Sequence, residues 1–297
     1  MVAIVLVNWN GYAYTAKCLD SLRKISYQDF VVIVVDNAST DDSVEQLRAH
    51  YPEIVLLENS SNAGFTGGNN LALNHVLNTA KYNYVMLLNN DTEVTEGFLE
   101  PLITSLDSST EIGAVQPKMR YVHDRSLIWN AGGKYNPWLG LPQTVGENQR
   151  DVGQFDEARA VDWITGCCIL MRVETLRSLG LLEERYFAYF EDVDWSFRLK
   201  AMGKKLLYEP KSLIYHEAGV SGKRKEKGKE GYLSPFVIQL NVRNHLYFYR
   251  KHVKGLYKIS AGFYQTGKVL AYALYFLLRG RKEKLKAVLK GLQEGLS

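Results

Sequence analysis

Short apolar runs that alternate with helical patterns constrain the fold of the first third of the chain most strongly. Aliphatic and β-branched residues fill 2–7, 31–36, 54–58 and 84–89. Between them, apolar residues recur at helical spacing in 14–25 and 70–80. Continuous apolar strands alternating with helices are typical of a parallel sheet that helices cover on both faces. The sequence therefore predicts an α/β fold with a mostly parallel sheet.

The far end of the chain has a different pattern. From Pro235 to Ser297 we expect helices with no strand between them, after a basic, glycine-containing loop that follows His216. A chain of 297 residues exceeds the usual size of a single domain. We predict a large domain over 1–231, with a loosely patterned excursion over 119–160, and a helical appendage over 232–297.

Composition limits the possible binding partners and the cellular compartment of the protein. The net charge of +4 gives no indication of a nucleic-acid partner. Three cysteines without metal-ligand spacing are typical of a reducing compartment, so we expect a cytoplasmic protein. The N-terminus lacks a basic segment before its short apolar run, which predicts a strand and not a signal peptide.

Polar residues follow three of the predicted strands. They are Asn8 and Asn10 after the first, Asp36 after the second, and Asn89, Asn90 and Asp91 after the fourth. Right-handed crossovers place the carboxyl ends of parallel strands along one edge of a sheet, where ligands bind in open α/β folds. One such residue alone would be a helix cap or a turn former. Three groups at one edge predict a binding crevice.

The end of the fourth strand is a candidate metal site. Asp91 is flanked by two asparagines, and Mg²⁺ or Mn²⁺ prefers oxygen ligands supplied by a few carboxylates and substrate phosphates. His216, at the end of a later predicted strand, could complete the site as a neutral imidazole. The alternative is that Asp91 caps a helix beginning in "DTEVTEGF".

A glycine-rich loop, "NAGFTGGNN" (62–70), precedes the second helical pattern. Glycines allow a ligand to approach the backbone, and a helix N-terminus offers free N–H groups. The loop matches neither common phosphate-binding motif, and "NWNGY" after the first strand disfavours a dinucleotide-binding dehydrogenase. The alternative is a turn without a ligand.

The stretch "YFEDVDWSFRLKAMG" predicts a helix ending at Gly203 with three acids at its start, Glu191, Asp192 and Asp194. The helix dipole stabilises carboxylates at that end, which alone would explain them. An ionised carboxylate that faces a crevice is also a competent general base.

Several of these stretches together resemble one family. "LVNWNGYAYTAKCLDSL", "VVIVVDNASTDDS", "NAGFTGGNN", "LLNNDTEV", "ITGCCILMRVETLRSLGLLEERYFAYFEDVDWSFRLKAMG" and "YHEAG" are similar to family 2 glycosyltransferases, in their rhamnosyltransferase-like branch. The ordered set spans 2–219, about three-quarters of the chain. The resemblance implies a GT-A fold with a Rossmann-like sheet, a nucleotide-diphosphate sugar donor and inversion at the anomeric carbon.

The resemblance also implies roles for individual residues. Asp36 would contact the nucleobase, and the nucleotide-sugar pocket would further include Asn8, Asn10, Asn62, Gly64, Gly67, Asn89, Asn90 and Arg243. Asp91 and His216 would bind Mg²⁺ or Mn²⁺, with Asn89 standing where the family has an acid. Asp192 would be the catalytic base and Glu191 its partner. Trp163 and Asp194 would contact the acceptor.

The branch implies dTDP-rhamnose as donor and a glycan or lipid-linked glycan as acceptor. One alternative is a UDP-sugar transferase of the same family. The other is a nucleotide-sugar-binding protein that has lost catalysis, which Asn89 in place of an acid would fit.

The C-terminal region is rich in aromatic and basic residues. Gln265 and Lys268 interrupt the apolar stretch 259–278, so we expect a helix that lies on the inner face of the cell membrane and does not cross it. The alternative is a helical hairpin that forms a homodimer.

Overall fold

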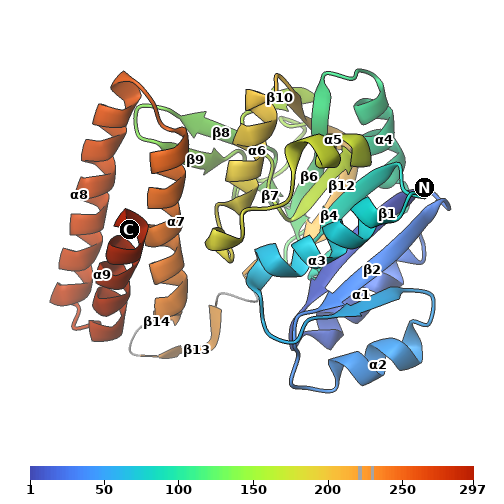
Figure 1. The fold of residues 1–297 in the computed structure, drawn as a ribbon, viewed down its shortest axis with the longest axis horizontal. Helices are drawn as coiled ribbons and strands as arrows, with labels where there is room; N and C mark the ends of the chain where they lie inside the picture. Colours follow the sequence, from blue (N-terminus) through green and yellow to red (C-terminus); the bar gives the residue numbers. More distant parts are fainter. Residues whose placement is uncertain (220–222, 229–230) are drawn as a thin grey trace. The chain divides into compact units, whose positions relative to one another are not determined.

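The computed structural model describes residues 1–219, 223–228 and 231–297, and the chain divides into two compact units. Unit 1 comprises 1–134, 144–187 and 191–218, and unit 2 comprises 135–143, 188–190 and 219–297. Figure 1 shows the elements of both. Part of the basic loop after His216, at 220–222 and 229–230, lies outside the described residues. The domain boundary at residue 231 stays a prediction.

A large sheet forms the centre of unit 1. Its strands are β1 (Val2–Asn8), β2 (Phe30–Asp36), β3 (Val55–Glu58), β4 (Tyr84–Leu88), β5 (Thr92–Val94), β6 (Ile112–Tyr121), β7 (Ile128–Asn130), β10 (Arg159–Val161), β11 (Cys168–Arg172) and β12 (Lys205–His216). The main order is β10-β12-β6-β11-β4-β1-β2-β3. The pairs β4-β1, β1-β2 and β2-β3 are parallel, whereas β11 runs antiparallel to both β4 and β6.

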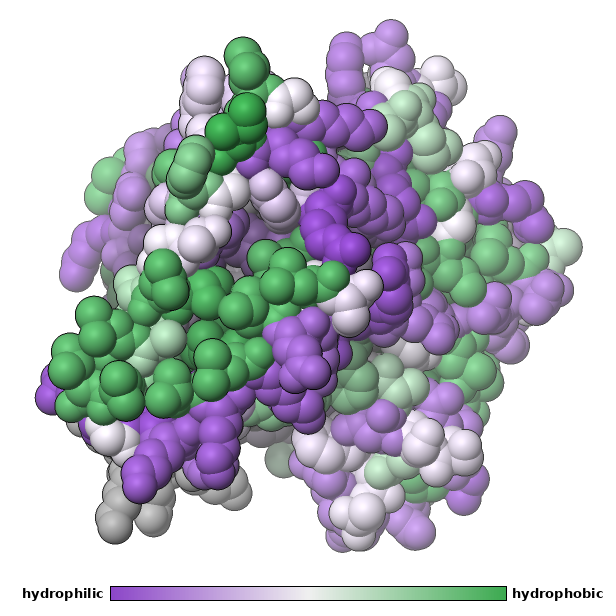
Figure 2. All heavy atoms as spheres, turned by 60° about the vertical axis from the view of Figure 1, so that its left-hand side comes forward, coloured by the Kyte–Doolittle hydropathy of each residue, from purple (hydrophilic) through white to green (hydrophobic). Residues whose placement is uncertain are grey.

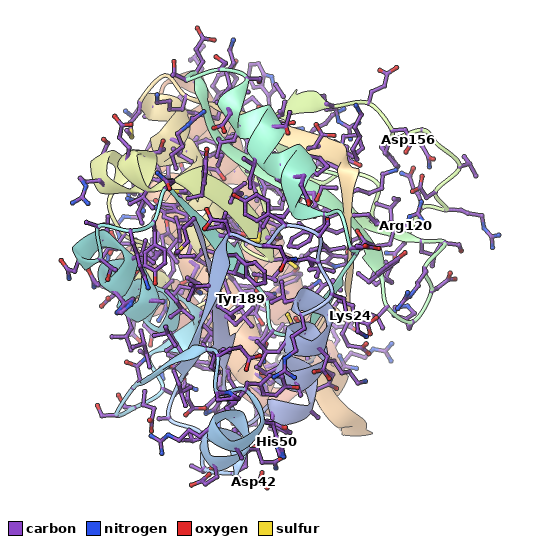
Figure 3. The ribbon with its side chains drawn as sticks, turned by 90° about the vertical axis from the view of Figure 1, so that its right-hand side faces the viewer. Lys24, Asp42, His50, Arg120, Asp156 and Tyr189 are labelled. Carbon is purple, nitrogen blue, oxygen red and sulfur yellow. The ribbon has the colours of Figure 1, made fainter. Side chains whose placement is uncertain are left out.

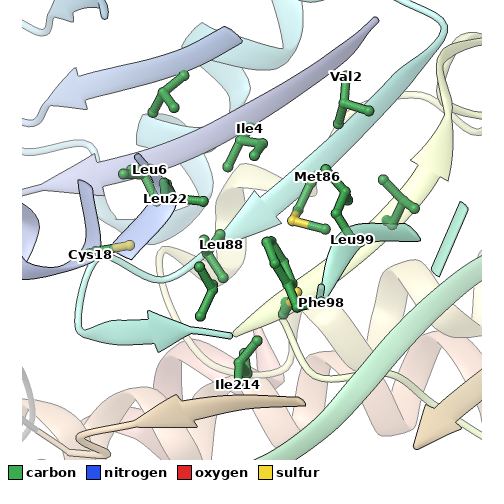
Figure 4. Close-up of a cluster of buried hydrophobic side chains, with 14 of the residues drawn as sticks. Val2, Ile4, Leu6, Cys18, Leu22, Met86, Leu88, Phe98, Leu99 and Ile214 are labelled. Atoms are coloured by element: carbon green, nitrogen blue, oxygen red, sulfur yellow. The ribbon is translucent and has the colours of Figure 1, made fainter. Parts of the chain in front are cut away.

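Helices cover both faces of this sheet. They are α1 (Tyr12–Leu22), α2 (Ser43–His50), α3 (Gly64–Asn78), α4 (Leu99–Asp107), α5 (Val173–Leu179) and α6 (Glu191–Ala201). On one face, alternate residues of β1 pack with α1 and α4, as Figure 4 shows for Ile4, Leu22 and Leu99. On the other face, Val5 packs in a cluster with residues of α3, α5 and α6. Because alternate residues of β1 are buried on opposite faces of the sheet, the strand is apolar along its whole length. The predicted α/β fold is confirmed.

Two local predictions were wrong. The stretch after Asp91 does not begin a helix, because Thr92–Val94 forms β5, which pairs with β12, and α4 begins only at Leu99. The helix predicted over 70–80 is α3, which begins at Gly64 and not at Asn70, so most of the glycine-rich loop is helical. In the first case, the pairing of β5 with β12 outweighed the local tendency of the sequence to form a helix.

The excursion after β6 is held to the sheet by an ionic cluster centred on the buried Lys118 and Asp151. The Lys118 ammonium lies 3.1 Å from an Asp151 oxygen and also pairs with Asp156, and the Arg120 Nε lies 2.9 Å from Asp151. Figure 3 labels Arg120 and Asp156 in this region. The excursion also contains β8 (Gly133–Asn136) and β9 (Leu141–Thr144).

Unit 2 is built on three helices, α7 (Pro235–His252), α8 (Leu256–Leu278) and α9 (Lys282–Leu296), besides the small strands β13 (Lys223–Gly228) and β14 (Gly231–Leu233). The Ser234 hydroxyl caps α7, and Pro235 occupies its first turn. Ile238, Val242, Phe276 and Val288 belong to one apolar cluster that joins the three helices. The prediction of helices without strands from Pro235 onward is confirmed. Among the described residues, no helix is long and apolar enough to span a membrane.

Candidate active site

The ends of β1 and β2 bring two polar side chains together. Asn8 and Asp36 are register partners, and the Asn8 Nδ2 donates to Asp36 Oδ1 at 2.8 Å. Ser39 donates its backbone N–H and its hydroxyl to the same carboxylate, at 2.8 and 2.6 Å. Asn8 Oδ1 accepts from the Thr15 hydroxyl at 2.7 Å. Asp36 is thus an ordered, buried acceptor at the predicted strand edge.

The glycine-containing segment is tied to the same edge. The Asn37 side chain donates to Asn62 Oδ1 at 3.0 Å and to the Gly64 carbonyl at 2.9 Å. Gly64 has a φ of +71°, and a Cβ there would lie 2.4 Å from the Phe187 carbonyl oxygen. Glycine is therefore required at this position by the packing of Phe187 as well as by the backbone angle.

Asn10 and Gly67 occupy flanking positions. Asn10 has a φ of 48°, and its Oδ1 accepts from the Thr40 N–H at 2.8 Å, which orders the loop after β2 against the loop after β1. Gly67 lies in the first turn of α3. Their contact with a nucleotide stays a prediction.

At the metal site predicted after β4, the side chains of Asp91 and His216 lie next to each other. His216 Nε2 lies 3.0 Å from Asp91 Oδ1 and 3.5 Å from Asn89 Nδ2. Both ring and carboxylate are largely buried, and the imidazole packs edge-on against Trp129 with ring centres 4.2 Å apart. Asn90 instead turns to α1, where its Nδ2 donates to the Thr15 hydroxyl at 2.8 Å.

The donor atoms at this position suit a divalent metal. One carboxylate and one imidazole are acceptable ligands for Mn²⁺, with diphosphate oxygens supplying the rest. His216 Nδ1 is buried and has no hydrogen-bond partner within the described residues, whereas Nε2 faces the Asp91 carboxylate. Among the described residues there is no cluster of three or more His, Cys, Asp and Glu side chains that could hold a metal ion.

Asp192 lies at the start of α6, where two backbone N–H groups hold its carboxylate. Gly166 donates to Oδ2 and Val193 to Oδ1, each at 2.8 Å. The next residue, Cys167, accepts from the Asn89 N–H at 2.8 Å through its carbonyl oxygen. Residues 166 and 167 therefore connect the carboxylate of Asp192 to the strand end that carries Asn89.

Glu191 is buried beside Asp192. Its Oε2 atom has no hydrogen-bond partner within the described part of the chain. Burial, and then the charge of Asp192, raise the pKa of Glu191 well above its usual value. Burial also raises the pKa of Asp192, although the N–H groups of Gly166 and Val193 oppose that effect. The pair therefore holds a proton more tightly than exposed carboxyls do.

The two predicted acceptor residues are both buried. Asp194 pairs with Arg198, whose Nε lies 2.9 Å from Asp194 Oδ2. Trp163 donates its indole N–H to the Lys134 carbonyl at 3.0 Å. These contacts hold α6 and β8 in place, and they provide no support for an acceptor role.

Arg243 belongs to α7 in unit 2. Its Nε donates to Asn244 Oδ1 at 2.9 Å, and its Nη1 lies 3.8 Å from Glu294 Oε2. Asn244 in turn donates to the carbonyls of Ala188 and Tyr189, at 2.7 and 2.8 Å. A contact between Arg243 and a diphosphate stays a prediction.

Three residues at the site escaped the sequence reasoning. Thr15 and Ser39 orient Asn8 and Asp36, and Gly166 orients Asp192. A serine three residues after a strand-ending aspartate is a turn signal that could have identified Ser39. No local signal marks Thr15 or Gly166, because their partners come from other elements.

Several solved structures share this fold. The crystal structure of GalNAc-T7 with UDP, GalNAc and Mn²⁺ has a TM-score of 0.65 at 15% identity, over 84% of this chain and 47% of that chain. This chain thus spans about half the length of GalNAc-T7. Staphylococcus aureus TarS 1–349 with UDP-GlcNAc has a TM-score of 0.61 at 16% identity, over 98% and 81% of the two chains. The predicted GT-A fold is confirmed.

Sequence comparison identifies the family. The profile of Glycosyl transferase family 2 matches residues 3–180, more than half of the chain. The chain belongs to glycosyl transferase family 2, as predicted, and is a glycosyltransferase.

Two curated relatives are rhamnosyltransferases. The N-acetylglucosaminyl-diphospho-decaprenol L-rhamnosyltransferase of Mycobacterium tuberculosis is 25% identical over 242 residues, covering 75% of this chain and 78% of the relative. Rhamnosyltransferase WbbL of Escherichia coli is 25% identical over 232 residues, covering 73% and 84%.

Proposed function

We propose that this protein transfers a sugar from a nucleoside-diphosphate donor to a hydroxyl of a glycan or lipid-linked glycan, with inversion at the anomeric carbon. The observation that carries the proposal is the connection between two sites on unit 1. Asp91 and His216 form a metal-compatible pair, and the 166–167 backbone joins the adjacent Asn89 to the carboxylate of Asp192. A leaving group and a base are needed together in a single displacement.

The nucleotide would lie along the ends of β1 and β2. Asp36 is held in a fixed orientation by Asn8 and Ser39, so it can present an acceptor to a nucleobase N–H without reorganising. Asn10, Asn62, Gly64 and Gly67 supply the surrounding loop backbone. Asn89 and Asn90 would contribute neutral polar groups next to the diphosphate.

Asp91 and His216 would hold Mg²⁺ or Mn²⁺ through Oδ1 and an imidazole nitrogen. When bound, the metal supplies Lewis-acid stabilisation of the charge that develops on the diphosphate leaving group. Asn89 replaces a carboxylate, so the protein contributes less negative charge and the donor must supply more ligand oxygens.

Asp192 would act as the general base. Its two N–H donors favour the ionised form and aim the carboxylate, which removes the proton from the acceptor hydroxyl as that oxygen attacks the anomeric carbon. The attack forms the new C–O bond and breaks the bond to the diphosphate in one step, which inverts configuration. Burial raises the pKa of Glu191, which favours its neutral form, and a neutral Glu191 would keep a second negative charge away from the base.

Two rhamnosyltransferases among the relatives favour dTDP-L-rhamnose as the donor. A UDP-sugar is the competing donor, since TarS 1–349 was solved with UDP-GlcNAc. The Mycobacterium relative is named for an acceptor that is a lipid-linked diphosphate, which favours the same acceptor class here.

Calorimetry with dTDP, UDP and GDP, each with Mn²⁺, Mg²⁺ or EDTA, tests the proposal. We expect metal-dependent binding of one nucleotide, followed by transfer from the matching sugar nucleotide. Binding without any transfer or donor hydrolysis would favour the second candidate, a nucleotide-sugar-binding protein without catalysis, for which Asn89 is the specific observation. No binding under any condition would contradict both.

We also propose that unit 2 contacts an anionic membrane surface on the cytoplasmic side. One side of α8 exposes large apolar side chains, namely Leu256, Ile259, Phe263, Leu270, Leu274, Leu277 and Leu278. Figure 2 shows hydrophobic side chains gathered into one patch on the face that it brings forward. The sequence between Glu230 and Glu283 contains no acidic residue, and basic residues flank the helix at Lys251, Lys254, Arg279 and Arg281. Apolar side chains flanked by cations suit anionic headgroups.

Co-sedimentation with phosphatidylglycerol vesicles tests the membrane contact. We expect Phe263→Glu with Leu270→Glu to reduce binding at least tenfold, and Val152→Glu, an equally exposed apolar residue of unit 1, to leave it unchanged. If the wild type ignores vesicles but is a dimer in light scattering, and the double variant is a monomer, the homodimer reading of α8 is correct instead.

A further inference from the structure

Unit 2 contains a cavity between α7 and α8. It has a volume of about 260 Å³. Its walls are mainly apolar, with Ile238, Val242 and Leu246 from α7, Val269 from α8, and Phe190 and Leu233 from the adjoining segments. Small-molecule sites are typically of this kind, mostly apolar with a few polar groups that orient the ligand.

Two titratable side chains of facing helices also line this cavity. Lys268 Nζ lies 3.2 Å from His245 Nδ1, and His245 Nε2 lies 2.7 Å from the Gly140 carbonyl oxygen. A carbonyl accepts only, so Nε2 carries the imidazole proton and Nδ1 is the acceptor that faces the lysine. Burial lowers the pKa of His245 to about 3 and also lowers the pKa of Lys268. The histidine is therefore neutral and offers the ammonium no charge.

Lys268 lacks a counter-ion in the part of the chain that the structure describes. Its ammonium contacts the neutral His245 and the ring of Tyr272, whose centre lies 5.9 Å away. An ammonium has three N–H donors, and a neutral partner at one of them leaves the others available. A largely buried cation without a carboxylate is costly for the fold, and an anion brought by a ligand would offset that cost.

We propose that this cavity binds an amphiphilic phosphate, with the phosphate against Lys268 and an apolar chain along Ile238, Val242 and Val269. A small hydrated anion would gain nothing from the apolar walls, and a neutral chain would leave the ammonium unpaired. The absence of acidic residues between Glu230 and Glu283 favours an anion over a cation. The binding of an amphiphilic phosphate is independent of the proposed function. The further step, that this ligand is the lipid-linked acceptor of the transfer reaction, rests on that function.

Fluorescence or calorimetric titration of the full chain with dodecyl phosphate, below the concentration at which it forms micelles, tests the site. We expect dodecyl phosphate to bind at least tenfold more tightly than inorganic phosphate or dodecyl maltoside. Lys268→Met, which keeps the chain length but removes the charge, is expected to weaken binding at least tenfold. Lys258→Met is the matched control, an exposed lysine on the same helix, and is expected to bind as the wild type does.

A second variant keeps the test decisive if Lys268→Met does not fold. Val269→Phe fills the apolar part of the cavity, and we expect it to weaken dodecyl phosphate binding while inorganic phosphate binding stays as weak as in the wild type. Equal binding of inorganic and dodecyl phosphate, or equal losses for the Lys268 and Lys258 variants, would overturn the proposal. Calorimetry with the donor nucleotide on the same samples separates the two proposals, since intact nucleotide binding without dodecyl phosphate binding contradicts this one alone.

Discussion

The backbone N–H of Gly166 donates to the Asp192 carboxylate at 2.8 Å. The adjacent Cys167 carbonyl accepts from the Asn89 N–H, also at 2.8 Å, so one short segment before β11 contacts both Asp192 and the strand end beside Asp91. A segment hydrogen-bonded on both sides restricts the relative position of the two sites. Positioning of this kind is where much of the rate enhancement in a single displacement arises.

Asp192→Asn should abolish sugar transfer and preserve nucleotide binding. The amide keeps the size of the side chain but cannot take a proton, and loss of a general base costs about 10²–10⁴-fold in rate. Steady-state kinetics and calorimetry on the same preparation measure the two effects. Glu157→Gln, at an exposed acid of the same unit, is the control and should retain full activity. If nucleotide affinity falls as much as the rate does, Asp192 is not the base.

Asp91→Asn should remove the dependence of nucleotide binding on the metal. The carboxylate is the only anionic ligand that the Asp91–His216 pair offers, so its loss weakens the metal and leaves only the direct contacts of the nucleotide. The ratio of nucleotide affinities in Mn²⁺ and in EDTA measures this, and we expect it to fall toward one. Glu147→Gln, on the exposed excursion, should leave the ratio unchanged. An unchanged ratio in Asp91→Asn would place the metal elsewhere.

Glu191→Gln should stabilise the protein more at pH 8 than at pH 5. The pKa of Glu191 is raised in the folded state, so the native protein binds the extra proton and loses stability as pH rises through that pKa. Glutamine cannot ionise and removes this loss. Thermal melts at both pH values check it, with about 2–4 °C expected per kcal/mol for a chain of this size. Glu174→Gln, at an exposed acid on α5, should give equal melting temperatures relative to wild type at the two pH values. A stabilisation independent of pH would contradict the raised pKa.

Gly64→Ala should cost more stability than Gly203→Ala. Both glycines have positive φ, at 71° and 76°, so alanine at either position costs about 1–2 kcal/mol of backbone strain. At Gly64 the new Cβ would also lie 2.4 Å from the Phe187 carbonyl oxygen, whereas nothing lies within 4 Å at Gly203. Overpacking adds about 1–3 kcal/mol at Gly64. Urea denaturation gives both values, and equal losses would show that the Phe187 contact relaxes freely.

The local pattern of the sequence was sufficient for most of the fold. The apolar runs at 2–7 and 31–36 became β1 and β2, and the helix predicted to end at Gly203 is α6. These predictions succeeded because strand and helix periodicity depends on residues that are neighbours in the chain. The prediction after Asp91 failed because β5 exists only through its pairing with β12, which comes more than a hundred residues later.

The candidate site divides in the same way. Sequence alone singled out Asp36, Asp91 and Asp192 as candidates, since acids at strand ends and at a helix start are visible without coordinates. Asp91 and His216 were both predicted metal ligands, but they are 125 residues apart in the chain, and only the tertiary structure shows that their side chains lie 3.0 Å from each other. It also brought His245 and Lys268 together at one cavity. Which polar groups lose their water and which partner they then require is decided by packing between distant segments, and no local pattern of residues encodes that.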